Sequence, residues 1–194
     1  LAVIGQSEGL APADKKLYAL RDVTGTVDSI PLIASSVMSK KLASGAQAIL
    51  LDVKVGSGAF MKTIEEARAL AKAMVDIGRE NGRSVKAVLT DMDRPLGHAI
   101  GNALEIREVI DTLKGHGPED LTHECIIMAA HMLVLSHICD YETALTRVRE
   151  ALDSGAALER LRLMIDAQGG NSSVIDDESL LAIGQCTYDV IAPK

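Results

Sequence analysis

Two pairs of polar side chains, each at the spacing of one helical face, have the chemistry to bind one small planar ligand. Tyr18 and Arg21 are three residues apart, and Ser36 and Lys40 are four apart. Residues at these spacings share one face of a helix. A pyrimidine base presents two carbonyl oxygens and one N–H, for which arginine, lysine and serine supply donors and an acceptor. We therefore predict that Arg21, Ser36 and Lys40 bind a pyrimidine if their helices face each other.

Two cations beside such a base suit the cleavage of its bond to a sugar. When an N-glycosidic bond to a pyrimidine breaks, negative charge develops on the base and spreads onto its carbonyl oxygens. Donors already in place, which bind more strongly as this charge grows, lower the barrier. The alternative is a pair of solvated faces, with Ser36 as a small packing residue. A serine–lysine hydrolase fits less well, because Ser36 and Lys40 are one residue further apart than the S-x-x-K pattern requires.

Composition narrows the class of protein. The 194 residues suit one domain, or one domain with a small appendage, and the net charge is −7. Since phosphate contacts need clustered positive charge, we expect no nucleic-acid partner. No apolar run reaches the roughly 18 residues of a membrane helix, so we expect no membrane partner. Three cysteines form neither a metal motif nor an even-numbered disulfide frame, which indicates a cytoplasmic protein. The chain begins without Met, which suggests a piece of a longer protein.

Hydrophobic periodicity alternates between strand and helix in the part of the chain that follows these residues. Strand, helix and strand within about 60 residues favour βαβ units, and hence an α/β fold with a central, largely parallel or mixed sheet flanked by helices. Residues 119–138 are apolar on most sides, so we expect deep burial there. We predict strands at 1–6, 48–55, 85–90 and 188–192, and helices at 12–22, 30–43, 64–81, 99–114, 119–138, 141–153 and 157–167.

Three further sites have the composition of ligand-binding segments. Gly56-Ser57-Gly58 lies between a strand and a helix, where phosphate loops occur, although a tight turn is the simpler interpretation. Phe60 is either a core residue or the apolar wall of a base pocket. Backbone carbonyls of Leu96 and Ala99, with the Glu108 carboxylate, form a hard-oxygen set suited to potassium or calcium. The alternative for Glu108 is a surface carboxylate without a ligand.

Several long segments resemble the type II nucleoside phosphorylases, the family of thymidine and pyrimidine-nucleoside phosphorylases. They are LAPADKKLYALRDVTGTV at 10–27, IASSVMSKK at 33–41, LDVKVGSGAFMK at 51–62, TDMDRPLG at 90–97 and GNALE at 101–105. The resemblance covers nearly the whole chain. It implies phosphorolysis of pyrimidine nucleosides such as uridine, thymidine and deoxyuridine, with phosphate as co-substrate, to free base and pentose 1-phosphate.

The resemblance also implies roles for individual residues and an arrangement of domains. Arg21 and Lys40 would be catalytic, the pocket would include Tyr18, Val27, Ile33, Ser36 and Phe60, and Leu96, Ala99 and Glu108 would hold part of a potassium or calcium site without an organic cofactor. The family is homodimeric, with a small all-α domain and a larger α/β domain. By that pattern, residues 1–12 form a strand and hinge, 13–44 a helical hairpin of the small domain, 45–180 the α/β portion and 181–194 a linker.

The family's phosphate-binding segment has no counterpart in the chain. In the family it precedes the position of Leu1, as does the other half of the cation site, and a C-terminal portion follows the position of Lys194. We therefore expect the 194-residue chain alone to be inactive in phosphorolysis. Two other interpretations stay open: a phosphoribosyltransferase of related fold, and a non-catalytic interaction module that uses the helical face for protein contact.

Overall fold

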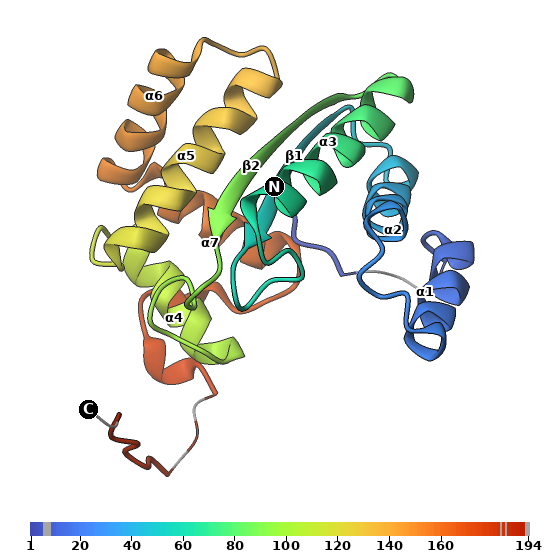
Figure 1. The fold of residues 1–194 in the computed structure, drawn as a ribbon. Coiled ribbons are helices and arrows are strands. Elements are labelled where there is room, and N and C mark those ends of the chain that lie inside the picture. Colours follow the sequence, from blue (N-terminus) through green and yellow to red (C-terminus); the bar gives the residue numbers. More distant parts are fainter. Residues whose placement is uncertain (6–8, 183, 185, 193–194) are drawn as a thin grey trace. The chain divides into compact units, whose positions relative to one another are not determined.

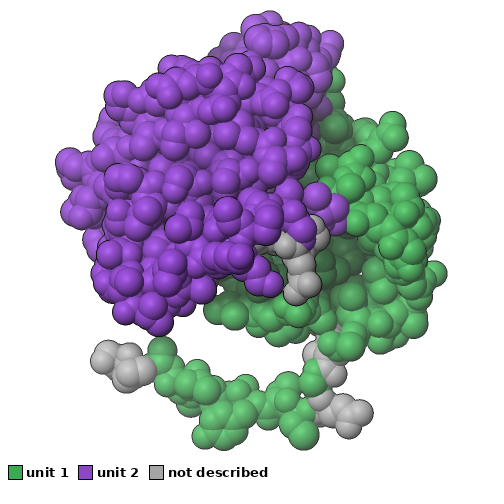
Figure 2. Space-filling model, turned by 90° about the vertical axis from the view of Figure 1, so that its right-hand side faces the viewer, with its two compact units in different colours: residues 1–2, 97–122, 150–194 green, residues 3–96, 123–149 purple. Residues whose placement is uncertain are grey.

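The structure is a computed structural model that describes residues 1–5, 9–182, 184 and 186–192. Their contacts divide the chain into two compact units, which Figure 2 distinguishes by colour. Unit 1 comprises residues 1–2, 97–122 and 150–194, and unit 2 comprises residues 3–96 and 123–149. All residues that we predict to bind the base belong to unit 2. None of the helices in the described ranges combines the length and apolar character needed to cross a membrane.

A helical hairpin, α1 (Pro12–Thr24) and α2 (Ile30–Ala43), lies near the start of unit 2 (Figure 1). Each helix has proline in its first turn, where a missing N–H costs nothing. Gly25 ends α1 with a left-handed φ of 65°, and its N–H donates to the Arg21 carbonyl. Glycine adopts this conformation without a Cβ clash, so the chain reverses direction directly after α1. The predicted helix–turn–helix is confirmed.

A βαβ unit follows, formed by β1 (Ala48–Val55), α3 (Ile64–Glu80) and β2 (Ser84–Asp91). The two strands are parallel, with Ala48 opposite Ser84. A parallel pair needs a crossover, which α3 supplies. Thr63 caps α3 in a capping box with Glu66, in which each side chain accepts a hydrogen bond from the other residue's N–H. The predicted parallel sheet is confirmed.

The core of unit 2 lies where α2 and one face of the sheet pack against α3. Met38 of α2 is fully buried. A Cβ on Gly78 of α3 would lie 2.2 Å from Val85 Cγ2 and 3.1 Å from Met38 Cε, so the missing side chain permits this close packing. Alternate residues of β1 face the same core because strand side chains alternate between faces. The buried set is Ile33, Ala34, Met38, Ile49, Leu51, Val53, Met61, Ala67, Leu70, Ala71, Met74 and Val85.

The other face of the sheet carries polar residues such as Lys54 and Lys86, and it meets α5 (Glu119–Leu135), which forms a hairpin with α6 (Tyr141–Asp153) (Figure 1). Lys54 of β1 pairs with Glu124 at 2.7 Å, and the His131 ring stacks on Tyr141. Only Ala130 of α5 is buried. The predicted deep burial of 119–138 is therefore wrong. A helix that is apolar on all sides is deeply buried only if other segments pack against every side. The contacts with Lys54 and Tyr141 involve only the sides of α5 that face β1 and α6.

Unit 1 contains α4 (Asn102–Leu113), α7 (Ala156–Ala167) and two short 3₁₀ helices, η1 (Ser172–Ile175) and η2 (Glu178–Leu180). Arg162 of α7 binds both carboxylate oxygens of Asp176, at 2.9 and 2.8 Å. Lys114 donates to the Ile175 carbonyl at 2.9 Å. These contacts connect the C-terminal part of unit 1 to α4 and α7.

Two predicted strands are not formed. Residues 1–5 and 188–192 contain no strand, and Gln6 lies outside the described residues. Within the described part of the chain the sheet consists of β1 and β2 alone, and a strand needs a partner for its backbone groups. The predicted helix at 99–114 begins instead at Asn102, because Gly101 has a φ of 127°, outside the helical region.

The division into units also differs from the predicted domain boundary. We expected the hairpin at 13–44 to separate from the segment that begins at residue 45. In the structure the hairpin belongs to the same unit as the βαβ segment. The physical reason is that the apolar face of α2, including Ala34 and Met38, shares one core with α3 and the sheet.

Candidate functional site

The polar faces of α1 and α2 meet at a buried carboxylate. Lys40 Nζ donates to Asp14 Oδ2 at 2.6 Å and to Ser36 Oγ at 3.1 Å. Asp14 is 8% exposed and Ser36 is 6% exposed. The structure thus brings the predicted Ser36–Lys40 pair together and adds Asp14, which the sequence reasoning missed. The available signal was spacing, because Asp14 lies four and seven residues before Tyr18 and Arg21 and so shares their face of α1.

The surroundings of Asp14 favour its ionised form. Burial by itself raises the pKa of a carboxyl group, because it penalises the charged form. Hydrogen bonding with Lys40 and Ser36 and the positive charges of Lys40 and Arg21 outweigh that effect, so the pKa of Asp14 is lowered from its ordinary value. The influence of Arg21 on this pKa indicates that both cations act on the same small region between α1 and α2.

Arg21 is buried, and part of its hydrogen-bonding capacity is unused. The residue is 7% exposed, one terminal nitrogen donates to the Val27 carbonyl, and the guanidinium carbon lies 5.2 Å from the centre of the Tyr18 ring. Its Nε has no hydrogen-bond partner among the described residues. A buried donor without a partner costs free energy.

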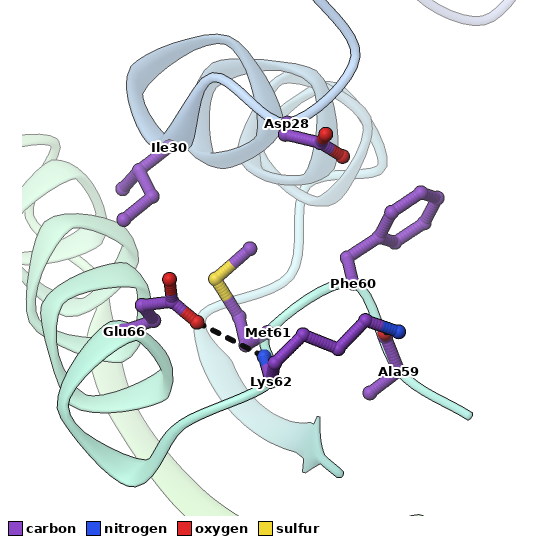
Figure 3. Close-up of a pocket in the computed structure, with 7 residues that line it drawn as sticks. All are labelled: Asp28, Ile30, Ala59, Phe60, Met61, Lys62 and Glu66. Atoms are coloured by element: carbon purple, nitrogen blue, oxygen red, sulfur yellow. Dashed lines mark hydrogen bonds between the residues drawn. The ribbon is translucent and has the colours of Figure 1, made fainter. Parts of the chain in front are cut away.

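The predicted apolar residues occupy different environments. Ile33 is buried in the core, Val27 is half-buried, and Tyr18 and Phe60 are 44% and 60% exposed. Phe60 borders two pockets, of about 290 and 490 Å³. In the smaller one its ring lies across from Ile30 and beside Asp28 (Figure 3).

The two pockets that Phe60 borders do not include the cations. Neither of the two pockets is lined by Arg21, Ser36 or Lys40 among the described residues. The larger pocket instead follows a neighbouring face of α2, formed by Ile33, Val37 and Lys41. The structure therefore places Phe60 at a pocket beside the α2 face of Ile33, Val37 and Lys41, and not at the face that carries Ser36 and Lys40.

The loop at Gly56-Ser57-Gly58 is a tight turn whose N–H groups are already bonded. The Ser57 N–H donates to Asp93 Oδ1 at 2.7 Å, and the Gly56 and Gly58 N–H groups donate to the carbonyls of Met61 and Met92. Phosphate loops need free N–H groups that point at the ligand. The structure therefore favours the simple turn over a phosphate site at this loop.

The predicted cation ligands Ala99 and Glu108 lie together in unit 1, and Leu96 belongs to unit 2. Glu108 Oε1 accepts hydrogen bonds from the N–H groups of His98 and Ala99, at 2.8 and 3.0 Å. A Cβ on Gly97 would lie 2.4 Å from Glu108 Oε2, so the loop wraps closely around this carboxylate.

The groups at this loop have the chemistry of a site for a hard cation. A second carboxylate, Asp120, accepts from the Gly97 N–H at 3.2 Å. Carboxylate and carbonyl oxygens are the ligands that hard cations prefer, so Ala99 and Glu108 fit part of such a site. In the ranges that the structure describes, no group of three or more His, Cys, Asp or Glu side chains is arranged to hold a metal, so backbone oxygens would have to contribute.

Comparison with known proteins agrees with the resemblance seen in the sequence. The model of the glycosyl transferase family, a/b domain, matches residues 1–158. A pyrimidine-nucleoside phosphorylase of Geobacillus stearothermophilus is 58% identical over 182 residues, which are 93% of this chain and 42% of that protein. A pyrimidine-nucleoside phosphorylase of Staphylococcus aureus (strain N315) is 57% identical over 195 residues, covering all of this chain and 45% of that protein.

The matches cover most of this chain but only part of each related enzyme. The chain spans less than half the length of the curated relatives that it matches. The family model, by contrast, covers most of the chain, including the hairpin with Arg21 and Lys40 and the complete βαβ unit. The chain belongs to the glycosyl transferase family that is defined by this a/b domain.

Proposed function

We propose that the complete protein containing this chain cleaves pyrimidine nucleosides with phosphate, and that this chain supplies the base-binding side of the cleft. The observation that carries the proposal is the buried Arg21 guanidinium, whose Nε lacks a partner among the described residues. Lys40 adds a second cation at the same helical hairpin. The names of relatives at 57–58% identity support the same reaction.

The proposed reaction transfers a pentose from a base to phosphate. A phosphate oxygen forms a bond to the anomeric carbon while the bond from that carbon to the base nitrogen breaks. The electron pair of the broken bond passes to the base, which leaves as an anion and then takes up a proton. Arg21 and Lys40 stabilise the charge that develops on the base carbonyls, and the Ser36 hydroxyl provides a further polar contact. Tyr18, Val27, Ile33 and Phe60 are the proposed apolar surround.

The first prediction is the reaction itself. We expect the complete protein to convert uridine and inorganic phosphate to uracil and ribose 1-phosphate, measured by chromatographic separation of base from nucleoside. The matched incubation contains uracil and 5-phosphoribosyl diphosphate in place of uridine and phosphate. Formation of a nucleotide in that incubation, without phosphorolysis in the first, would identify a phosphoribosyltransferase. Activity in neither would leave the interaction module as the better interpretation.

We also propose that Ala99 and Glu108, within unit 1, hold part of a potassium or calcium site, and that the complete protein is a cytoplasmic homodimer. The close packing of loop 97–99 around the Glu108 carboxylate supports the cation proposal. Calcium takes six to eight oxygen ligands. The ligands that these residues do not supply must therefore come from water or from other segments.

Replacing Glu108 by glutamine tests the cation proposal. The amide oxygen still accepts hydrogen bonds from His98 and Ala99, so the loop is retained while the negative charge is lost. We expect the KCl concentration for half-maximal activity to rise about 10-fold or more, as a charged contact worth roughly 1.5–3 kcal/mol implies. Activity and thermal stability are titrated with KCl in potassium-free buffer.

Glu105→Gln is the matched control for this experiment. Glu105 lies on the same helix and its carboxylate accepts from the Gly101 N–H at 3.0 Å, outside the proposed ligand set. Its KCl dependence should equal that of the wild type. An unchanged KCl and CaCl₂ dependence in Glu108→Gln would rule out a cation role for that carboxylate.

A further inference from the structure

Asp14 lies on the polar face of α1 and pairs with Lys40 on the polar face of α2, and the proposed reaction does not use it directly. It lies in the first turn of α1, whereas Lys40 lies in the last turn of α2. Their ion pair at 2.6 Å joins residues 26 positions apart, and the Asp14 side chain is 9% exposed. A buried carboxylate is costly unless it is paired, so this contact restricts where the Lys40 ammonium can lie.

The contacts that Lys40 makes with described residues leave one N–H donor for a ligand. An ammonium group has three N–H donors. One N–H donates to Asp14 and another donates to Ser36. Because the ammonium nitrogen is tetrahedral, the directions of these two N–H bonds determine the direction of the third. Ser36 is itself buried and on the same face of α2, so the serine and the carboxylate together fix the orientation of the ammonium group.

We propose that Asp14 is a positioning residue for base recognition, which holds the Lys40 ammonium so that its remaining N–H points to the pyrimidine. This inference rests on the proposed function and assigns a role to a residue outside the predicted base-binding set. The lowered pKa of Asp14 supports it, because the carboxylate stays charged at neutral pH.

Charge alone and a positioning role predict opposite effects on the rate when the Asp14 charge is removed. Asp14 places a negative charge beside a site where negative charge develops on the leaving base, so its removal would by charge alone stabilise the transition state and raise the rate. A positioning role predicts a lower rate, because a displaced ammonium no longer meets the base carbonyl at hydrogen-bond distance. The sign of the change therefore distinguishes a bystander charge from a positioning residue.

The experiment is a double-mutant cycle with uridine phosphorolysis by the complete protein. Asp14→Asn keeps the shape of the side chain and removes its charge. We expect it to lower kcat/KM by about 10-fold, within the range that small misplacements of a binding group produce. In a Lys40→Ala background the same change should lower kcat/KM by less than about 2-fold, because Asp14 acts through the absent lysine. Asp14→Glu, which restores the charge, should recover part of the activity.

Asp76→Asn is the matched control, because Asp76 forms an exposed ion pair with Lys72 on α3, remote in sequence from the hairpin. It should leave kcat/KM unchanged. Circular dichroism verifies that each variant is folded, and the smaller uncharged variant Asp14→Ser replaces Asp14→Asn if the latter is not. An unchanged or higher kcat/KM in the folded variant, or an equal loss with and without Lys40, overturns the positioning role while the proposed function stands. A wild-type protein without phosphorolysis overturns both.

Discussion

Replacing Arg21 by alanine in the complete protein is expected to lower kcat/KM for uridine phosphorolysis by about 10- to 150-fold. Hydrogen bonds to charged groups are worth about 1.5–3 kcal/mol, and about 1.4 kcal/mol corresponds to a factor of ten. The loss should appear in kcat as well as KM, since the guanidinium binds the base more strongly as negative charge develops. Steady-state kinetics over a range of uridine concentrations, at saturating phosphate, measures both parameters.

Two variants on the same helix show whether the loss reflects charge, geometry or folding. Lys16→Ala removes an exposed cation from α1 and should leave both parameters unchanged. Arg21→Lys keeps the charge but loses the planar fork of donors, so it should retain only part of the activity. If Arg21→Ala folds and turns over uridine as fast as the wild type, the guanidinium has no part in binding the base.

Local sequence patterns predicted the elements around the site well. The hairpin around Gly25 and each single strand of the βαβ unit depend on turn residues and periodicity within one short segment, so the local pattern contains the information needed. The helical spacing of Ser36 and Lys40 likewise predicted a shared face, which their 3.1 Å contact confirms.

Interactions between distant segments were harder to predict. Asp14 pairs with a lysine 26 residues away, and helical spacing alone does not say which residue of α2 faces it. The strand predicted at 1–6 has an apolar composition, but a strand forms only when another strand supplies backbone partners. The prediction that α5 is deeply buried was wrong for a similar reason. Apolar composition shows which residues are suited to burial, but it does not show which other segments pack against them.

The second large effect is expected in the core that supports the site. Met38→Ala should lower the free energy of unfolding by about 2–5 kcal/mol, the range found when large buried side chains are truncated to alanine. Met38 is fully buried, and its Cε lies 3.1 Å from where a Cβ of Gly78 would be, so the neighbouring helix cannot easily fill the cavity. Urea denaturation followed by circular dichroism measures the change.

The position of Met38 links this stability to the site. It lies on the same helix as Ser36 and Lys40, so a loosened core should also displace the polar face. Met38→Leu keeps most of the volume and should cost less than about 1.5 kcal/mol. Met132→Ala, in a residue that is 54% exposed on α5, should change stability by no more than about 0.5 kcal/mol. Equal stability losses in Met38→Ala and Met132→Ala would mean that α2 is not anchored on α3 through Met38.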